Sequence, residues 1–332
     1  MIDQHQYIER ESGSVCNERL FGDRLIRLLY HGARENAPFL FKMATSSWSS
    51  GLLGFINFDL PFGSNRRFLE ECGVDLDECL DPPESLDTPR KVFERRIRYE
   101  QCRPMPEVQW AVVSPADARV LVGSFRDTSA LFLKEKFFDF EELLGRHKEE
   151  WLRAFTGGEF AVFRLTPDKY HYNHTPVAGT VRDIYEIDGG YHSCNPGAVV
   201  IEATPFSKNR RVVTVIDTDV PGGTGVGLVA MIEVVALMIG QIVQCYSYEG
   251  YTAPRPVEPG MFLRRGVPKS LYRPGSSTDV LIFQRDRMHF ADDIVRNMHD
   301  TRAASRFSHG FGRPLVETDV KVRSLIAVAV TN

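Results

Sequence analysis

The sequence predicts an α+β protein in which a helical N-terminal part packs on a β-rich domain. Within the first hundred residues, leucines at positions 20, 25, 28 and 29 have helical spacing, and Asp87-Thr-Pro forms a helix start signal. From about Val108 the sequence changes to short β-branched and aromatic runs that glycine and proline separate. We therefore expect a mainly helical region at residues 1–106 and a β-rich domain at 107–332.

Five segments of the second region have the composition of strands: residues 108–125, 158–167, 179–187, 198–206 and 211–220. A helical pattern at 139–155 lies among them and is interrupted by Gly145. The most apolar stretch, 226–243, contains Glu233, whose carboxylate would be costly in lipid. This stretch is therefore interpreted as a buried core segment rather than a membrane span.

The composition favours a soluble globular protein. A chain of 332 residues can bury a sizeable core, and 43% of its residues are hydrophobic and 25% charged. The net charge of −4 and the pI near 6.2 argue against a nucleic-acid partner. The polar start has no signal-peptide core, and no two of the six cysteines have Cys-x-x-Cys spacing, so we expect reduced thiols in a cytoplasmic protein.

One apolar segment has two interpretations. Residues 39–62 are rich in aromatic and small side chains. They form either helix–loop core or a surface that touches lipid or a second subunit.

Several short motifs are ambiguous when each is taken alone. The glycine-rich Gly222–Gly227 favours a flexible hairpin over a phosphate cradle, because no Lys-Ser/Thr follows it. His171 and His174 in "YHYNH" form a partial metal site at best. Asp117 in "SPADAR" fits an Asx turn, and that segment has a weak echo in "TPVAGT". The Gly-Ser-Ser of "RPGSSTDVLIF" fits a turn before a strand.

Taken together and in order, these motifs closely resemble the phosphatidylserine decarboxylase family of pyruvoyl enzymes. The resemblance covers about residues 20–330, and five segments carry it: "RPMPEVQWAVVSPADARVLVG", "FTGGEFAVFRLTPDKYHYNHTPVAGTV", "NRRVVTVIDTD", "VGLVAMIEVVALMIGQI" and "LYRPGSSTDVLIF". Two departures are Ala118 in place of a common glycine and a degraded paired-Phe segment, "RKVFERRI".

The resemblance implies a proenzyme that cleaves itself near residues 275–277. A serine hydroxyl attacks the preceding carbonyl, and β-elimination and hydrolysis then leave a pyruvoyl group on the new fragment. By motif, His174 is the base, Asp117 orients it, and His171 handles the substrate carboxylate and returns the proton. The pyruvoyl ketone does the work often done by pyridoxal phosphate, so neither that cofactor nor a metal is expected.

The serine that becomes the pyruvoyl group is left open by the motif. Gly-Ser spacing points to Ser276 after Gly275, whereas the register of the following strand residues, which end in Phe283, points to Ser277. We favour Ser277. Cleavage there leaves a fragment of residues 277–332, and cleavage at Ser276 leaves residues 276–332.

The implied reaction converts phosphatidylserine to phosphatidylethanolamine and CO2. The same chemistry on a free amino acid is the alternative, and a catalytically inactive lipid-binding relative is an alternative of another class. A swinging-arm carrier is disfavoured because neither "SPADAR" nor "TPVAGT" offers a lysine. By family analogy we expect a homodimer, cytoplasmic with peripheral membrane contact.

Overall fold

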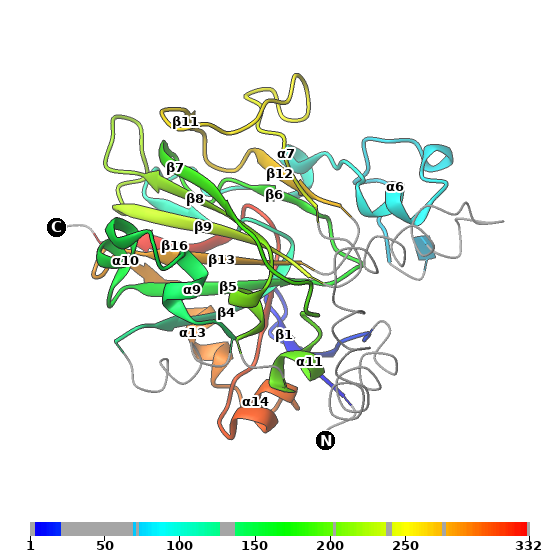
Figure 1. Ribbon diagram of the computed structural model, residues 1–332. Coiled ribbons are helices and arrows are strands. Elements are labelled where there is room, and N and C mark those ends of the chain that lie inside the picture. The colour runs from blue at the N-terminus through cyan, green and yellow to red at the C-terminus, as the bar shows by residue number, and fades with distance from the viewer. Residues whose placement is uncertain are drawn as a thin grey trace.

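The computed structural model describes residues 4–20, 69–70, 73–126, 137–201, 204–236, 241–273 and 277–330. Over these ranges the chain is rich in strands, and short helices pack around the sheets (Figure 1). The predicted mixture of β-rich and helical structure is confirmed at this coarse level.

Most of the strands lie after residue 107, and two lie near the N-terminus. They are β1 (Gln6–Glu9), β2 (Val15–Asn17), β3 (Ala111–Val113), β4 (Ala118–Ser124), β5 (Glu159–Leu165), β6 (Tyr172–His174), β7 (Gly179–Ile187), β8 (Arg211–Asp217), β9 (Leu228–Val235), β10 (Ile242–Gln244), β11 (Phe262–Leu263), β12 (Pro268–Tyr272), β13 (Ser277–Phe283), β14 (Met288–Phe290), β15 (Thr318–Val320) and β16 (Leu325–Ala329).

The described helices are all short. They are the 3-10 turn η3 (Pro83–Ser85) and the α-helices α6 (Pro89–Phe93), α7 (Tyr99–Cys102), α9 (Phe140–Leu144), α10 (Glu149–Phe155), α11 (Pro196–Ile201), α12 (Pro205–Lys208), α13 (Asp292–Met298) and α14 (Arg306–Phe311). Within the described ranges, none of the helices is long and apolar enough to span a bilayer.

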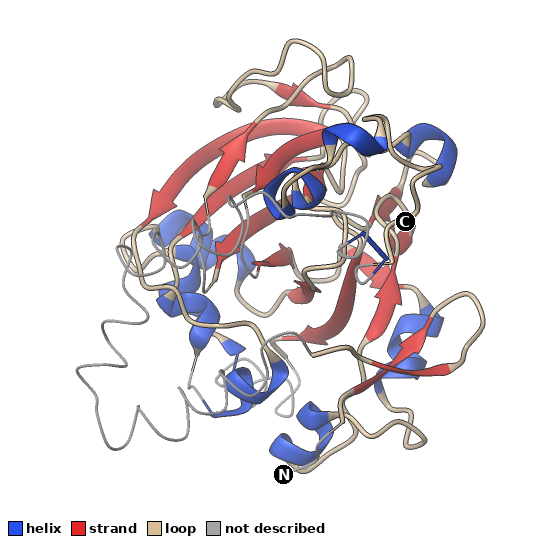
Figure 2. Cartoon of the chain, turned by 90° about the vertical axis from the view of Figure 1, so that its right-hand side faces the viewer, coloured by secondary structure: helices blue, strands red, loops and turns tan. Residues whose placement is uncertain are grey.

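A ten-stranded sheet forms the body of the protein, with the order β11-β7-β8-β9-β13-β5-β4-β15-β1-β2. β13 lies inside it, and every residue from Ser277 to Phe283 is paired with both β5 and β9 in antiparallel register. Neighbouring strands pair antiparallel except β1 and β15, which run parallel. Figure 2 shows the strands curving across the molecule.

Two hydrophobic clusters cover the two faces of this sheet. On one face α9 and α10 pack through Leu143, Leu144 and Phe155 against strand residues such as Ile282 (Figure 1). The other face packs against two three-stranded sheets, β10-β12-β6 and β14-β16-β3. The candidate site lies where the main sheet packs against β10-β12-β6.

Local sequence signals explain several boundaries. Gly145 has φ 92°, which favours glycine, and it separates α9 from α10 as the sequence predicts. The Thr88 side chain caps α6 by accepting a hydrogen bond from the Lys91 amide. Residues 222–227 lie in the connection between antiparallel β8 and β9, which confirms the hairpin interpretation. Of the stretch 226–243 that is interpreted as buried core, residues 229–235 of β9 are buried, whereas residues 241–243 are exposed or partly exposed.

The prediction of a strand at residues 198–206 is wrong. Pro196 begins α11 and Pro205 begins α12, where the ring has no amide hydrogen to lose and its φ suits a first helical turn. The Asn195 carbonyl accepts from the Val199 amide, and the Asn195 side chain accepts from the Gly197 amide. These start signals outweigh the β-branched composition of Val199 and Val200.

The described N-terminal residues differ from the helical expectation. Residues 6–17 form β1 and β2, which extend the main sheet, while α6 and α7 are the described α-helices before residue 107. Residues 21–68, with the apolar segment 39–62 and the leucines at 25, 28 and 29, lie outside the described residues. The domain boundary at 106/107 therefore stays a prediction.

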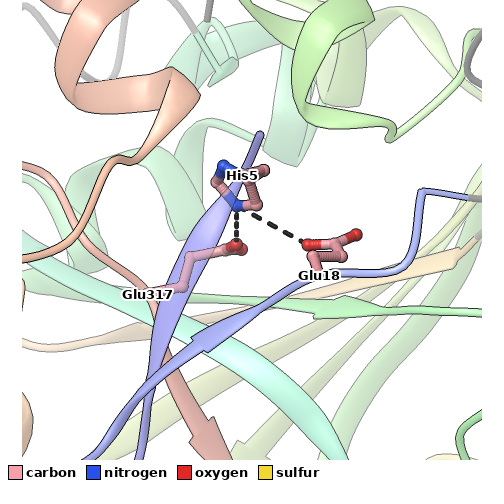
Figure 3. A group of neighbouring side chains, drawn as sticks. All are labelled: His5, Glu18 and Glu317. Carbon is pink, nitrogen blue, oxygen red and sulfur yellow. Dashed lines mark hydrogen bonds and ion pairs between the residues drawn. The ribbon is translucent and has the colours of Figure 1, made fainter. Parts of the chain in front are cut away.

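A buried ion-pair cluster holds this N-terminal hairpin to the sheet. The His5 ring lies between Glu317 and Glu18, with its Nε2 2.8 Å from Glu317 Oε2 (Figure 3). Arg164 of β5 bridges both carboxylates, and Arg119 lies 2.9 Å from Glu18. Although burial opposes ionisation, the charge of Arg164 lowers the pKa of Glu317 to about 2. The cluster therefore stays charged and connects residues far apart in sequence.

Candidate functional site

The site is built on two strand–turn–strand units that correspond to the weak sequence echo. "SPADAR" joins β3 to β4, and "TPVAGT" joins β6 to β7. The turns exchange backbone hydrogen bonds: the His174 amide donates to Pro115 O at 2.7 Å, and the Val113 amide donates to Pro176 O at 2.9 Å. This exchange brings the turn that carries Asp117 beside the strand that carries His174.

His174 is buried and neutral. Its Nδ1 lies 2.9 Å from the carbonyl oxygen of Gly266, which can only accept, so Nδ1 carries the proton. Nε2 therefore holds the lone pair and accepts from the Tyr170 hydroxyl at 2.9 Å. Burial lowers the pKa of His174 to about 3. The ring is thus a free-base imidazole at neutral pH, as a general base must be.

Tyrosine side chains surround this base. The Tyr170 hydroxyl lies 2.6 Å from that of Tyr251, and the Tyr99 ring meets the His174 ring edge-on with centroids 4.8 Å apart. The motifs alone indicated neither Tyr170 nor Tyr251. Tyr170 lies four residues before His174 in the segment "KYHYNH", and this spacing is a sequence signal for their contact. No sequence pattern indicates that Tyr251 belongs to the site.

Asp117 is buried in an ion pair rather than closing an Asx turn. Its carboxylate accepts from Arg103 Nε at 3.0 Å and Nη2 at 2.8 Å, and from the Val322 amide at 2.7 Å. Burial opposes its ionisation, but the hydrogen bonds and charge of Arg103 lower the pKa of Asp117. Among the described contacts, no hydrogen bond joins Asp117 to His174; its negative charge acts on the imidazole through space.

His171 has one nitrogen held and one open. Its Nδ1 lies 2.8 Å from the Lys169 carbonyl oxygen and so carries the proton. Its Nε2 is buried and has no hydrogen-bond partner among the described residues. The ring stacks on Phe93 at 3.4 Å between centroids, and burial lowers the pKa of His171 to about 3. The His171 carbonyl accepts from the Tyr272 amide, which fixes this segment to β12.

Ser277 begins β13 and is almost completely buried. Its Oγ has no hydrogen-bond partner within the described ranges, and its carbonyl oxygen accepts from Cys194 Sγ at 3.6 Å. Gly275 and Ser276 lie outside the described residues. The structure thus places Asp117 on a turn beside the strand that carries His174, and it places His171 against β12. It shows no hydrogen bond between Ser277 and either histidine in the described part.

One group of side chains has the composition of a metal site. His5, Glu18 and Glu317 offer ligand atoms within 4.8 Å of one another. Arg164 and Arg119 already neutralise both carboxylates, and His5 Nδ1 accepts from the Arg306 amide, so Nε2 carries the proton that Glu317 accepts. These contacts fit a structural ion-pair cluster better than a cation site.

Comparison with known proteins agrees with this arrangement. The family model described as phosphatidylserine decarboxylase matches residues 90–309, which contain every candidate site residue. A phosphatidylserine decarboxylase proenzyme from Fusobacterium nucleatum is 26% identical over 89% of this chain and 93% of its own length. One from Chlamydia trachomatis is 28% identical over 87% of this chain and 90% of its own. Phosphatidylserine decarboxylase proenzyme 2 of Oryza sativa is 32% identical over 70% of this chain and 35% of its own. The chain belongs to the phosphatidylserine decarboxylase family.

Proposed function

We propose that this protein is a self-processing decarboxylase that converts phosphatidylserine to phosphatidylethanolamine and CO2. The observation that carries the proposal is Ser277. A serine hydroxyl is buried without a partner at the start of a central strand, inside a chain whose relatives are named proenzymes. Such an orphaned polar group costs stability, which points to a chemical role.

His174 is the proposed base of the self-cleavage. Its Nε2 lone pair can take the serine proton once Tyr170 turns away or passes its own proton along the pair with Tyr251. The resulting imidazolium would be buried, and the nearby Asp117 carboxylate stabilises it. Arg103 keeps Asp117 ionised and fixed in direction.

The residues around Ser277 fit a group formed from its own side chain. Such a pyruvoyl group supplies a ketone that reacts with an amine and takes up the electrons released as CO2 departs. His171 Nε2 is a free lone pair at neutral pH, so we assign His171 to taking a proton from the substrate ammonium group as the amine reacts and to returning that proton to the substrate carbon once CO2 has left. Holding the substrate carboxylate would require protonation, which the burial of His171 opposes.

Decarboxylation of a free amino acid would use the same residues. The membrane contact and the homodimer also stay predictions, because the segment 39–62 lies outside the described residues. A catalytically inactive lipid-binding relative is the remaining alternative.

Intact-mass measurement with and without borohydride tests the proposal. The purified protein should give two fragments, and borohydride should add two hydrogens to the C-terminal one. The same protein should release CO2 from vesicles containing phosphatidylserine faster than from soluble serine or tryptophan. Faster release from a soluble amino acid would select the alternative substrate, and a single full-length mass in a protein that still binds vesicles would select the inactive relative.

A further inference from the structure

Two neighbouring strands, β9 and β13, present acidic side chains on the face that also carries Ser277. The register aligns Ser277 with Leu165 and Val235, and aligns Asp279 with Phe163 and Glu233. Residues two apart on a strand point to the same side, so Ser277 and Asp279 share a face, and Asp279 lies directly across from Glu233. This is the face that packs against β10-β12-β6.

Glu233 has all the partners that a buried carboxylate needs. Lys269 Nζ lies 2.7 Å from its Oε2, and both side chains are fully buried. Gln244 donates to the same oxygen at 3.0 Å, while the Ser270 hydroxyl and Asn173 Nδ2 donate to Oε1. The single cation of this cluster is therefore committed to Glu233.

Asp279 lacks such partners. It is fully buried, and Oδ1 accepts from the Tyr272 hydroxyl at 2.7 Å, whereas Oδ2 has no hydrogen-bond partner among the described residues. No ion pair joins it to a cation within the described ranges. Burial, and then the charge of Glu233, raise the pKa of Asp279 well above its usual value. Two carboxyl groups that share one lysine cannot both ionise cheaply.

The hydrogen bonds of Tyr272 agree with a neutral Asp279. The Tyr272 hydroxyl accepts from the Val234 amide at 3.1 Å and has one proton for two acceptors, Thr278 O and Asp279 Oδ1. With the acid proton on Oδ2, Oδ1 still accepts from Tyr272, and Oδ2 becomes a donor that Tyr272 does not use.

We propose that Asp279 is a neutral carboxylic acid that donates a hydrogen bond to the side-chain oxygen of residue 277 and so assists self-cleavage. This inference rests on the proposed function and adds a catalytic residue to it. The serine that this hydrogen bond would serve is Ser277, because residues two apart on β13 share a face.

The step that it assists is the β-elimination. His174 first passes the serine proton to the amide nitrogen of residue 277, which leaves as an amine when the ester forms, and its free lone pair then takes the Cα proton of residue 277. The electron pair of the Cα–H bond forms the Cα=Cβ double bond. The Cβ–Oγ bond breaks, and its electrons stay on Oγ, which leaves as an oxygen of the new carboxylate of residue 276. A hydrogen bond from Asp279 stabilises the negative charge that develops on this oxygen. An ionised Asp279 would repel it.

The test is the rate at which newly made full-length chain is cleaved. The chain is synthesised in a cell-free system, and loss of the 37.6 kDa precursor is followed over time. Asp279→Asn keeps a neutral donor of the same shape and should cleave within about threefold of the unaltered chain, whereas Asp279→Ala should be slower by about 10- to 100-fold. Glu159→Gln makes the same carboxyl-to-amide change at the far end of the β5–β13 ladder and should have no effect.

The pH profile separates this role from a structural one. The ratio of the unaltered rate to the Asp279→Asn rate should stay level or fall as pH rises, because only the acid form donates. A ratio that rises with pH, an Asp279→Asn chain as slow as Asp279→Ala, or an Asp279→Ala chain at the unaltered rate would each overturn the inference. Failure of the unaltered chain to cleave would instead overturn the proposed function. Protease resistance of each variant confirms that it has folded.

Discussion

The Arg103 guanidinium and the Asp117 carboxylate form a bidentate pair, with Nη2 2.8 Å from Oδ2 and Nε 3.0 Å from Oδ1. Each side chain is only 8% exposed. The pair joins the segment before β3 to the turn that lies beside His174. Asp117 is thus held in place by Arg103 rather than by His174. Its negative charge acts on the imidazole without a direct hydrogen bond.

Replacing Arg103 should impair both folding stability and self-cleavage. Arg103→Ala leaves the Asp117 charge buried and uncompensated, which should lower the free energy of unfolding by about 3–5 kcal/mol. Arg103→Lys keeps the charge but loses the two-pronged geometry, so a smaller loss is expected. Denaturant titration of each variant measures this. Equal stability of Arg103→Ala and the unaltered protein would contradict the importance of the pair.

Substitution of His174 and of His171 should block different steps of the reaction. His174→Gln removes the base, so only the 37.6 kDa chain should be seen by mass spectrometry. His171→Gln should still cleave, but its CO2 release should fall by about 100-fold or more, because proton transfer to the substrate is lost. A cleaved, active His174→Gln protein would remove His174 from its proposed role.

The serine variants should identify the scissile bond. Ser277→Ala should abolish cleavage, and Ser276→Ala should still yield a fragment of residues 277–332. The reverse result, with a fragment of residues 276–332 in the unaltered protein, would assign the chemistry to Ser276. Intact mass resolves the two fragments, since they differ by one residue.

Stability should fall on acidification before most carboxylates titrate. Both His171 and His174 have a folded-state pKa of about 3, below the ordinary 6.5, so the unfolded chain binds their protons first as pH falls. Each should lower the free energy of unfolding by up to about 1.4 kcal/mol per pH unit below 6.5. Urea titrations at pH 7, 6 and 5 measure the slope. His171→Gln should remove about half of the histidine part of it, and an unchanged slope would argue against a buried neutral ring.

The ion-pair cluster should control whether the N-terminal hairpin stays attached. Glu317→Gln leaves Arg164 and Arg119 with one carboxylate too few, at a cost of about 3–5 kcal/mol. Proteolysis near residues 10–20 should become faster as β1 and β2 detach. Glu149→Gln breaks a pair with Arg153 that is over three-quarters exposed, and it should change little. Equal protection in both variants would show that the cluster is dispensable.

Much of the fold was predictable because its signals are local. Short runs of β-branched, aromatic and other apolar residues predict β5, β8 and β13, and Gly145 predicts the break between α9 and α10. At 198–206 the β-branched composition predicts a strand, but Pro196 and Pro205 each start a helix. The parallel pairing of β1 with β15 joins residues about three hundred positions apart, and no local pattern indicates it.

The candidate site was likewise predictable only in part. Family motifs indicated Asp117, His171, His174 and the two serines, and the echo of "SPADAR" in "TPVAGT" now has a structural basis in the paired turns. The motifs did not indicate the pairing of Asp117. Arg103 opens the same motif, "RPMPEVQWAVVSPADARVLVG", but nothing in that motif shows that the two side chains meet, and the Val322 amide comes from a distant segment. The sequence does mark Asp279 as unusual, because it is an aspartate within the apolar run "STDVLIF".

The position of the proposed cut has a mechanical consequence. β13 is flanked on both sides by long ladders, and the residues after it supply β14, β15, β16, α13 and α14. Severing the chain before Ser277 would therefore release nothing. The two polypeptides would stay hydrogen-bonded to each other through the middle of the main sheet, so separating them would require unfolding the protein. Maturation would then be permanent, and exchange of the smaller piece could not serve as a control on activity.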